Sequence, residues 1–539
     1  MLRGATRRLL LRGLRGPRHP AALAAAAGSA VCIWSQSAAC CEPEPTFTAA
    51  EVAAHASMAD GVWVTLGDGV YDVTEFVRHH PGGDHILAAG GGPLEPLWAQ
   101  WQVHLTSRVM GHLQPLRIGR LAPADRLSGL YNIADPYDDE PERDGRLGVL
   151  GARPFDSETA REVLATAFWT PQHLFYVRNH LPAPRIDEDE HRLTLDWGGG
   201  RRRSFSVREL REELPQATLH ATLQCTGNRC DEVEPSAAGG IGQIGNAWWE
   251  GVRVRDLLAL RPPGEGGDGE ARDGKPGGDA AGTLHLHATG CDGYEVSIPL
   301  EKVRGDVLLA HSMNGEPLSR DHGAPLRLLA PGFVGARSVK WLQHLAVRPE
   351  ESGSVWQKRY YRMFPPWVRD LRDIDYDDGD VPPVYEFPVQ SAIVSPAAGD
   401  VVTLGDDGAL EARGYAVSGA GQRIVSVRLS TDGGESWRNA TLLGVASAVA
   451  EAGGGEGARG KLPPPAPPEH GRNWSWVLWR ARVPVPLGAR EVTLCCKAID
   501  SAYNTQPERA DYNLRGYLSN ASPKVAVSVE RAVPRCGGG

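Results

Sequence analysis

Three residues of this 539-residue chain have the types and settings of metal ligands. Cys225 ends an alternating run and is followed directly by Thr226–Arg229. A lone thiol at the mouth of a strand, beside glycine and polar hydrogen-bonding groups, suits a soft metal next to an oxyanion site. His80 opens a His-Pro-Gly-Gly turn, and His104 lies 24 positions further on, which suits the two sides of one haem iron. A thiolate metal site and a bis-histidine haem in one chain indicate a redox enzyme with internal electron transfer.

Length and charge indicate a multidomain protein with an acidic body. A chain of 539 residues is too long for one core, and its 41% hydrophobic and 23% charged residues are ordinary for globular domains. The net charge is −9 at pH 7, although the first 41 positions hold six arginines and no acidic residue. An acidic body repels nucleic acid and fits docking to a basic protein partner. We therefore expect no nucleic-acid partner.

Residues 1–44 are typical of a targeting segment. Met1–His19 is rich in arginine, free of acidic residues and spaced for a basic amphipathic helix, as mitochondrial presequences are. Ala21–Ala39 is rich in alanine and interrupted by polar residues, so we predict no stable membrane insertion. We expect cleavage near Cys40–Glu44 and sorting to the mitochondrial intermembrane space. A secretory signal is the alternative, but six arginines are too many for its basic region.

The next part of the chain predicts a small module and a linker. In the first module (residues 45–121), Val62–Leu66 and Val70–Val73 flank a Gly-Asp-Gly turn and predict a hairpin. A helical segment over Thr74–His79 should end at the His-Pro-Gly-Gly turn. Residues 122–146 are acidic and interrupted by prolines, which predicts an extended, mobile linker.

The rest predicts two larger modules and completes a multidomain α+β fold. The central module (residues 147–388) has a mixed α/β pattern with a surface insertion at Pro262–Gly282. The C-terminal module (residues 389–531) has short alternating strands and frequent turns, which favours an immunoglobulin-like β-sandwich. Residues 532–539 form a tail.

The first module predicts haem binding. Glycines after His80 let a porphyrin approach the backbone, and Leu87 and Leu97 can form walls of the pocket. His79 and His112 are weaker ligand candidates than His80 and His104, because His79 precedes the turn and His112 lies at an unusual spacing. The hairpin, the turn and the second histidine resemble cytochrome b5. The resemblance implies haem b, whose two histidine ligands allow electron transfer and leave no position for dioxygen.

The central module resembles the molybdopterin-binding domain of the sulfite oxidase family. The similarity is carried, in chain order, by Phe175–His180, Leu223–Arg229, Ile244–Trp249, Arg320–Gly323, Arg327, Gly335–Trp341, Trp356–Tyr361 and Asn513–Gly516. The order of presequence, cytochrome b5-like module, molybdenum module and sandwich is also similar to that of mitochondrial members. The resemblance implies oxidation of sulfite to sulfate at a molybdenum-molybdopterin centre. Electrons then pass through the haem to cytochrome c, and the C-terminal module forms a homodimer.

The resemblance also implies residue roles. Cys225 binds molybdenum, Arg178 and Arg515 bind the sulfite anion, and Tyr361 donates a hydrogen bond near the reacting oxygen. Two roles remain open for Arg337: it could form a structural ion pair or bind a ligand. The expected cofactor-binding residues are Tyr176, Val177, Arg178, Asn179, His180, Asp292, His322, Arg327, Ser338, Val339 and Lys340.

Two departures from the family pattern bear on the substrate site. The family has a second arginine where this chain has Cys230, and a pocket tryptophan where Glu234–Gly240 is short and rich in glycine. Loss of one charge-assisted contact costs about 1.5–3 kcal/mol, so we expect weaker sulfite binding. A non-enzymatic haem- and molybdopterin-binding homologue is therefore one alternative function. A nitrate-reductase-like enzyme is the other, although that family places its haem module after the molybdenum domain and adds a flavin domain.

Overall fold

The computed structural model describes residues 44–125, 135–235, 239–260, 283–303, 305–370, 374, 381–444 and 471–531. The expected presequence up to residue 43, the tail and the whole insertion at Pro262–Gly282 lie outside the described residues. Within the described ranges, no helix is long and apolar enough to cross a membrane.

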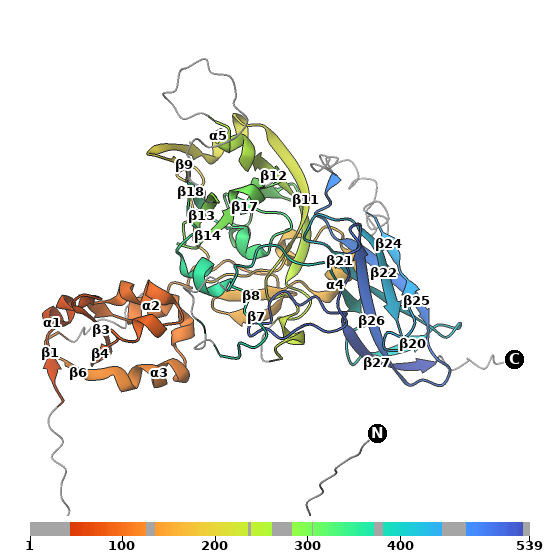
Figure 1. The fold of residues 1–539 in the computed structure, drawn as a ribbon, viewed down its shortest axis with the longest axis horizontal. Helices are drawn as coiled ribbons and strands as arrows, with labels where there is room; N and C mark the ends of the chain where they lie inside the picture. Colours follow the sequence, from red (N-terminus) through yellow and green to blue (C-terminus); the bar gives the residue numbers. More distant parts are fainter. Residues whose placement is uncertain are drawn as a thin grey trace, which may run out of the picture. The chain divides into compact units, whose positions relative to one another are not determined.

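The first module contains a small sheet and short helices, drawn in red and orange in Figure 1. The expected hairpin is confirmed: strand β3 (Gly61–Leu66) pairs antiparallel with β4 (Gly69–Asp72). The sheet order is β1-β6-β4-β3-β2, with β5 beside β3. The other elements are β1 (Thr46–Phe47), α1 (Ala49–Ala54), β2 (Ala56–Ser57), η1 (Val77–His79), η2 (Gly83–Ala89), β5 (Gly92–Pro93), α2 (Glu95–Gln100), η3 (Gln102–His104), α3 (Ser107–Leu113), η4 (Gln114–Leu116) and β6 (Arg117–Leu121).

The central module is built on two five-stranded sheets and a two-stranded ribbon. One sheet has the order β10-β9-β18-β13-β14; in the other, β11-β12-β15-β16, strand β17 also pairs with β15. The strands are β7 (Gly148–Ala152), β8 (Phe155–Glu158), β9 (Arg192–Gly198), β10 (Arg201–Ser206), β11 (Gln216–Gln224), β12 (Ile244–Arg253), β13 (His285–Gly290), β14 (Glu295–Pro299), β15 (Leu308–Met313), β16 (Glu316–Pro317), β17 (Arg327–Leu329) and β18 (Leu342–Arg348). The helices are α4 (Arg161–Thr166), η6 (Gln172–Leu174), α5 (Val207–Glu212), η7 (Cys230–Glu232), α6 (Val254–Leu258), η8 (Leu300–Lys302), η9 (Arg320–His322), η10 (Gly335–Arg337) and η11 (Trp356–Tyr360).

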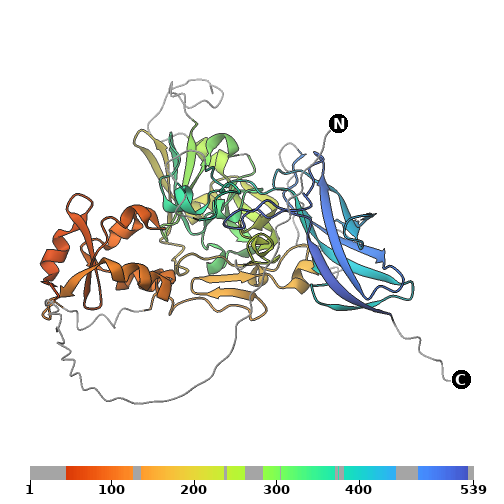
Figure 2. The same cartoon turned by 60° about the horizontal axis from the view of Figure 1, so that its bottom comes forward.

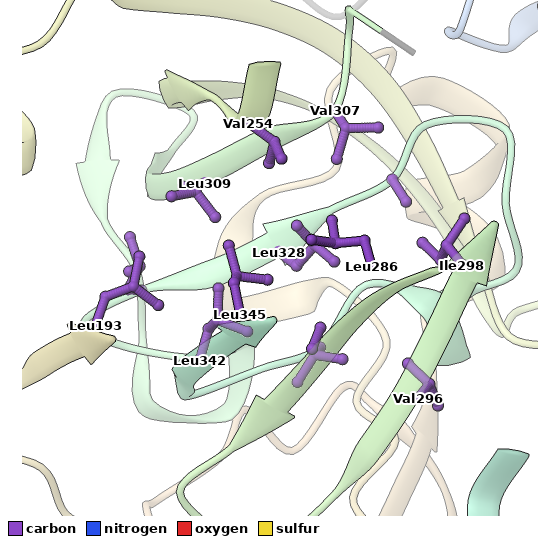
Figure 3. Close-up of a cluster of buried hydrophobic side chains, with 14 of the residues drawn as sticks. Leu193, Val254, Leu286, Val296, Ile298, Val307, Leu309, Leu328, Leu342 and Leu345 are labelled. Carbon is purple, nitrogen blue, oxygen red and sulfur yellow. The ribbon is translucent and has the colours of Figure 1, made fainter. Parts of the chain in front are cut away.

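A shared apolar core joins these two sheets. Figure 3 shows Leu286, Leu345 and Ile298 of one sheet beside Leu309 and Leu328 of the other. All five side chains are essentially inaccessible to solvent. Because burial of one such side chain stabilises a fold by about 1.5–3 kcal/mol, this core fixes the loops at the strand ends.

The C-terminal module is a two-sheet β-sandwich, as expected. The sheets have the orders β19-β21-β25-β24 and β20-β27-β26-β22-β23, and Figure 2 shows their strands in blue and cyan. In β25, buried and exposed residues alternate from Trp479 to Pro484, which is the pattern of a strand with one face in a core. The strands are β19 (Gln390–Ser395), β20 (Val401–Leu404), β21 (Ala409–Val417), β22 (Ile424–Ser430), β23 (Arg438–Asn439), β24 (Thr441–Leu443), β25 (Val477–Pro484), β26 (Glu491–Asp500) and β27 (Lys524–Arg531).

The acidic segment before the central module differs from the expected mobile linker. Arg143 forms hydrogen-bonded ion pairs with Asp321 at 2.8 and 2.9 Å and also pairs with Glu140. Glu140 in turn accepts a hydrogen bond from the backbone N–H of Ala183 at 2.6 Å. The described residues from 135 to 146 are thus attached to the central module, because Arg143 and Glu140 bond to Asp321 and Ala183 of that module. Residues 126–134 of the expected linker lie outside the described residues.

Candidate functional site

The two expected haem ligands face each other in the first module. His80 follows η1 and His104 ends η3, and their ring centres lie 6.0 Å apart with an angle of 15° between the ring planes. Metal–nitrogen bonds of about 2 Å would place two imidazoles on opposite sides of one iron at about this separation. The separation therefore fits an iron between the two rings.

Hydrogen bonds leave the same nitrogen of each histidine available. Nδ1 of His80 lies 3.0 Å from the carbonyl oxygen of Gly83, and Nδ1 of His104 lies 2.8 Å from that of Trp101. A carbonyl only accepts, so Nδ1–H donates in both rings and Nε2 is the free ligand atom. Burial lowers the pKa of both histidines, which keeps them neutral and able to bind iron. The partly buried side chains of Leu87 and Leu97 pack against the core of this module.

In the central module, Cys225 lies directly after β11, as expected. Its N–H donates to the carbonyl of Gln243 at 2.9 Å, and its carbonyl accepts from the N–H of Asn228 at 3.1 Å. These bonds hold the thiol at the end of a strand whose side chains are packed into a core. Burial raises the pKa of the Cys225 thiol to about 11 in the absence of a metal. A metal that binds there must therefore displace a proton.

Arg229 anchors the cysteine loop to the C-terminal module. Its backbone has φ of 65°, a left-handed conformation that costs a non-glycine residue about 1 kcal/mol or more. Its fully buried guanidinium donates to the carbonyls of Ser391 and Ala521 at 3.0 and 2.6 Å and pairs with Glu232 at 2.6 Å. These charge-assisted bonds hold the loop that follows Cys225.

A cavity opens beside Cys225. Strand ends and loops of the central module form its walls. The lining residues are Phe175, Tyr176, Arg178, Asn179, His180, Leu223, Cys225, Thr226, Asp292, Tyr294, Asp321, His322, Arg327, Gly335, Ala336, Ser338, Val339, Lys340, Trp341 and Tyr361.

One part of the cavity wall is a basic, hydrogen-bonded network. The Nζ of Lys340 donates to the carbonyl of Asp321 at 3.0 Å and to the side-chain oxygen of Asn179. Burial lowers the pKa of Lys340 to about 7 and that of Arg327 to about 10. His322 Nε2 lies 2.9 Å from the carbonyl of Gln172, so it donates there. An anionic ligand would offset the cost of burying these cations.

Aromatic residues surround another part of the cavity. The phenol oxygen of Tyr361 lies 2.8 Å from Nε2 of His180, and burial moves the pKa of Tyr361 up and that of His180 down. Both side chains are therefore neutral at pH 7. Tyr294 stacks on His180 with ring centres 5.5 Å apart, which fixes the imidazole. Arg178 faces the same cavity, and its Nε lies 3.4 Å from the carboxylate of Asp156.

The hydrogen-bond donors and cations in the cavity wall fit a molybdopterin cofactor. Arg327 Nε and Thr226 Oγ1 are buried and have no hydrogen-bond partner among the described residues. Buried polar atoms without partners are costly, which points to a polar ligand that supplies acceptors. The cations Lys340, Arg327 and Arg178 suit its phosphate, and the thiol of Cys225 suits a soft metal.

Most of the predicted site residues meet in this cavity, but two do not line it. The side chain of Val177 is buried, and its N–H donates to Ser157 Oγ at 3.2 Å. The Arg515 guanidinium lies 5.9 Å from the ring centre of Tyr517, whose ring stacks on Tyr361 at 6.1 Å. Arg515 is therefore one aromatic ring away from the cavity wall.

The sequence predicted no role for several residues that line the cavity. Asp321 and Phe175 occur within quoted motifs, but nothing in their spacing showed that they would face the cofactor cavity. Tyr294 follows Asp292 by two positions, and its hydroxyl donates to the carbonyl of Ala336 at 2.9 Å. Arg337 proves to be fully buried and donates to the carbonyls of Val384 and Tyr361 at 2.8 and 3.4 Å. It supports the backbone of Tyr361 and does not line the cavity.

Cys230, which stands in place of the family's second arginine, also does not line the cavity. It is 4% exposed and packs between two glycines. A Cβ added to Gly239 would lie 2.8 Å from its sulfur, and one added to Gly516 would lie 2.8 Å from its Cβ. Gly239, in the short segment, therefore lies against the small side chain of Cys230.

Comparison with known proteins agrees with this geometry. Residues 48–122 match the cytochrome b5-like heme/steroid binding domain, residues 180–356 the oxidoreductase molybdopterin binding domain, and residues 381–530 the Mo-co oxidoreductase dimerisation domain. The chain is thus a molybdopterin oxidoreductase with a cytochrome b5 module. It is 42% identical to sulfite oxidase of Gallus gallus, over 88% of this chain and 98% of that protein. It is 40% identical to mitochondrial sulfite oxidase of Homo sapiens, over 90% and 84% of the two chains. The chain belongs to the sulfite oxidase family.

A solved structure shows the same fold at greater distance. The sulfane dehydrogenase SoxCD from Paracoccus pantotrophus superposes with a TM-score of 0.52 at 21% identity, covering 74% of this chain and 90% of that one. This similarity concerns the fold alone. The expected cofactor types and the expected multidomain α+β fold are confirmed by the family matches.

Proposed function

We propose that this chain oxidises sulfite to sulfate at a molybdenum-molybdopterin centre beside Cys225 and passes the electrons to a b-type haem. The observation that carries the proposal is the position of the Cys225 thiol in the wall of a cavity that also contains Arg178, Lys340 and Tyr361. Membership of the sulfite oxidase family supports the substrate.

Different residues of the cavity bind the metal, the phosphate and the edges of the pterin. When bound, the molybdenum centre supplies oxygen-atom transfer and takes up two electrons. Cys225 would hold the metal as a thiolate, and Lys340 and Arg327 would neutralise the phosphate of the pterin. The neutral His322 lines the same wall, and Asn179 and Asp292 would bond the pterin edges. The remaining expected cofactor-binding residues are Tyr176, Val177, Arg178, His180, Ser338 and Val339.

Two arginines and a tyrosine act on the substrate. The guanidinium of Arg178 faces the cavity and attracts the sulfite anion, and the neutral Tyr361 hydroxyl donates a hydrogen bond to it. Arg515, held among aromatic rings next to Tyr361, contributes the second positive charge to the substrate region.

The electron transfer and the assembly that we propose are those of the sulfite oxidase family. His80 and His104 would hold the haem iron, and a haem held by two histidines would supply electron transfer. We infer that cytochrome c is the acceptor, since a basic protein would dock on an acidic body. The match of residues 381–530 to a dimerisation domain supports a homodimer. Relatives named as mitochondrial support a mitochondrial location. The arginine-rich N-terminus followed by the short apolar stretch Ala21–Ala39 supports the intermembrane space.

A matched pair of cysteine variants tests the proposal. Cys225→Ser removes the thiolate, whereas Cys291→Ser changes an exposed thiol that does not line the cavity. Sulfite-dependent reduction of cytochrome c and bound molybdenum are measured in both purified variants. We expect both to be lost in C225S and retained in C291S. Equal sulfite oxidation by C225S and the unmodified chain would overturn the assignment, and molybdenum-loaded unmodified protein without sulfite turnover would favour the non-enzymatic alternative.

A further inference from the structure

Both haem-binding histidines donate from Nδ1 to a backbone carbonyl, but different groups lie against their rings. The His80 ring lies against the backbone of the His-Pro-Gly-Gly turn: a Cβ added to Gly82 would lie 2.8 Å from its Cε1 atom. The hydrogen bond from Nδ1 to Gly83 fixes the same ring in its plane. The backbone on one side and this bond together define the orientation of His80.

His104 lies against an indole. The ring of Trp98 is stacked on the His104 imidazole, with ring centres 5.3 Å apart and 13° between the planes. Trp98 is 7% exposed and belongs to the core of the first module, in helix α2. The two sequence neighbours of His104 are not buried: Val103 is 64% exposed and Leu105 is 61% exposed. The side chains next to His104 in sequence therefore give it little support, and Trp98 supplies a rigid face.

We propose that Trp98 is a positioning residue for the haem, which fixes the plane of the His104 imidazole and stabilises the oxidised iron through it. This inference rests on the haem ligation by His80 and His104 proposed above. An offset stack between aromatic rings resists rotation of the imidazole about its bond to iron. It thereby holds the two axial imidazoles close to the 15° interplanar angle seen here.

The same contact acts on the haem potential. Oxidation adds one positive charge to the iron, and part of that charge spreads onto the bound imidazole. The negative face of an aromatic ring attracts positive charge, most strongly for tryptophan, less for tyrosine and least for phenylalanine. A stacked indole therefore favours the ferric state, and its removal should raise the midpoint potential.

The first module offers a matched control for the same type of stack. Trp63 lies on His55, a histidine that we do not assign to the haem, with ring centres 3.6 Å apart and 5° between the planes. Trp63→Leu removes an indole from a histidine of the same module without touching an axial ligand. It should lower the stability of the module and leave the haem spectrum unchanged.

The test uses the full-length protein with haem bound and needs no sulfite. Electron paramagnetic resonance of the ferric haem reports the angle between the axial imidazole planes through the spread of its g-values. We expect Trp98→Leu to change this spread, and Trp98→Phe and Trp63→Leu to keep that of the unmodified protein. Unchanged g-values in W98L, or an equal change in W63L, would overturn the proposal.

Redox titration keeps the proposal testable where W98L does not retain haem. Trp98→Tyr and Trp98→Phe keep a stacked ring, and we expect the midpoint potential to rise in the order Trp, Tyr, Phe. A different order would contradict the electrostatic role. If the unmodified ferric protein lacks a low-spin bis-imidazole signal, the haem ligation itself is wrong, whereas a normal signal that is insensitive to Trp98 refutes only the positioning role.

Discussion

The hydroxyl of Tyr361 and Nε2 of His180 share a hydrogen bond of 2.8 Å in the wall of the cofactor cavity. Tyr361 lies at the end of the π-helical turn η11, and His180 follows the segment that carries Arg178. The bond joins two distant parts of the chain across the place where we position the substrate. It orients the hydroxyl toward the cavity, where the hydroxyl remains protonated because burial raises its pKa.

Tyr361→Phe should lower kcat/KM for sulfite by about ten- to a hundredfold, because a lost hydrogen bond to a charged group costs about 1.5–3 kcal/mol. The neighbouring Tyr360→Phe is the control, since Tyr360 does not line the cavity. Steady-state kinetics of both variants check the prediction. Equal losses in the two would show that the tyrosine pair acts through packing.

Lys340 should make cofactor retention depend on pH. Its pKa is about 7 in the cofactor-free protein, and an anionic phosphate would raise it, so cofactor binding takes up a proton above pH 7. Affinity should therefore be highest below pH 7 and fall by up to about tenfold per pH unit above it. Molybdenum content after dialysis between pH 6 and 9 measures this. Lys340→Arg should remove the pH dependence and keep the binding, whereas a pH profile unchanged in K340R would assign it to another group.

Acid should release the haem from the first module. Burial lowers the pKa of His80 and His104, so released or unfolded forms take up protons first as the pH falls below the usual histidine pKa of about 6.5. Haem retention and stability should both decline on acidification and be restored above that pH. The Soret absorbance follows the change. His104→Ala should lose haem at neutral pH, whereas His79→Ala changes an exposed side chain and should behave as the unmodified protein.

Cys230→Arg should not restore a stronger sulfite site. A guanidinium has no room between Gly239 and Gly516. Overpacking there costs about 1–3 kcal/mol, and burial of the positive charge adds a further cost. We expect C230R to lower the denaturation midpoint and to leave KM for sulfite no better, whereas Cys230→Ser should stay close to the unmodified protein in both. A lower KM in C230R would show that this position faces the substrate.

Local pattern predicted the backbone around the expected metal ligands. The alternation before Cys225 indicated a strand, and β11 ends one residue before it. The glycines after His80 indicated a tight turn, and the ring of His80 packs on that backbone. Both patterns lie in consecutive residues, so they can be recognised from the sequence without the three-dimensional structure.

Tertiary packing determined what the sequence did not show. Tyr294 meets Ala336 in the cavity wall through a hydrogen bond that spans 42 positions of the chain, and no spacing in the sequence indicates that contact. Motif similarity predicted Arg515 as a sulfite-binding residue, but its side chain lies among aromatic rings beside the cavity. The acidic segment near Arg143 looked like a free linker because the partner of Arg143, Asp321, lies 178 positions away in the chain.

The most direct test of the proposed function is anaerobic mixing of excess sulfite with the oxidised protein that contains both molybdenum and haem, without any external acceptor. The haem spectrum is recorded as a function of time. We predict full reduction of the haem in the unmodified protein and in C291S, and none in C225S. A haem that dithionite reduces but sulfite does not, in protein shown to contain molybdenum, would contradict electron transfer from a sulfite-oxidising centre to this haem.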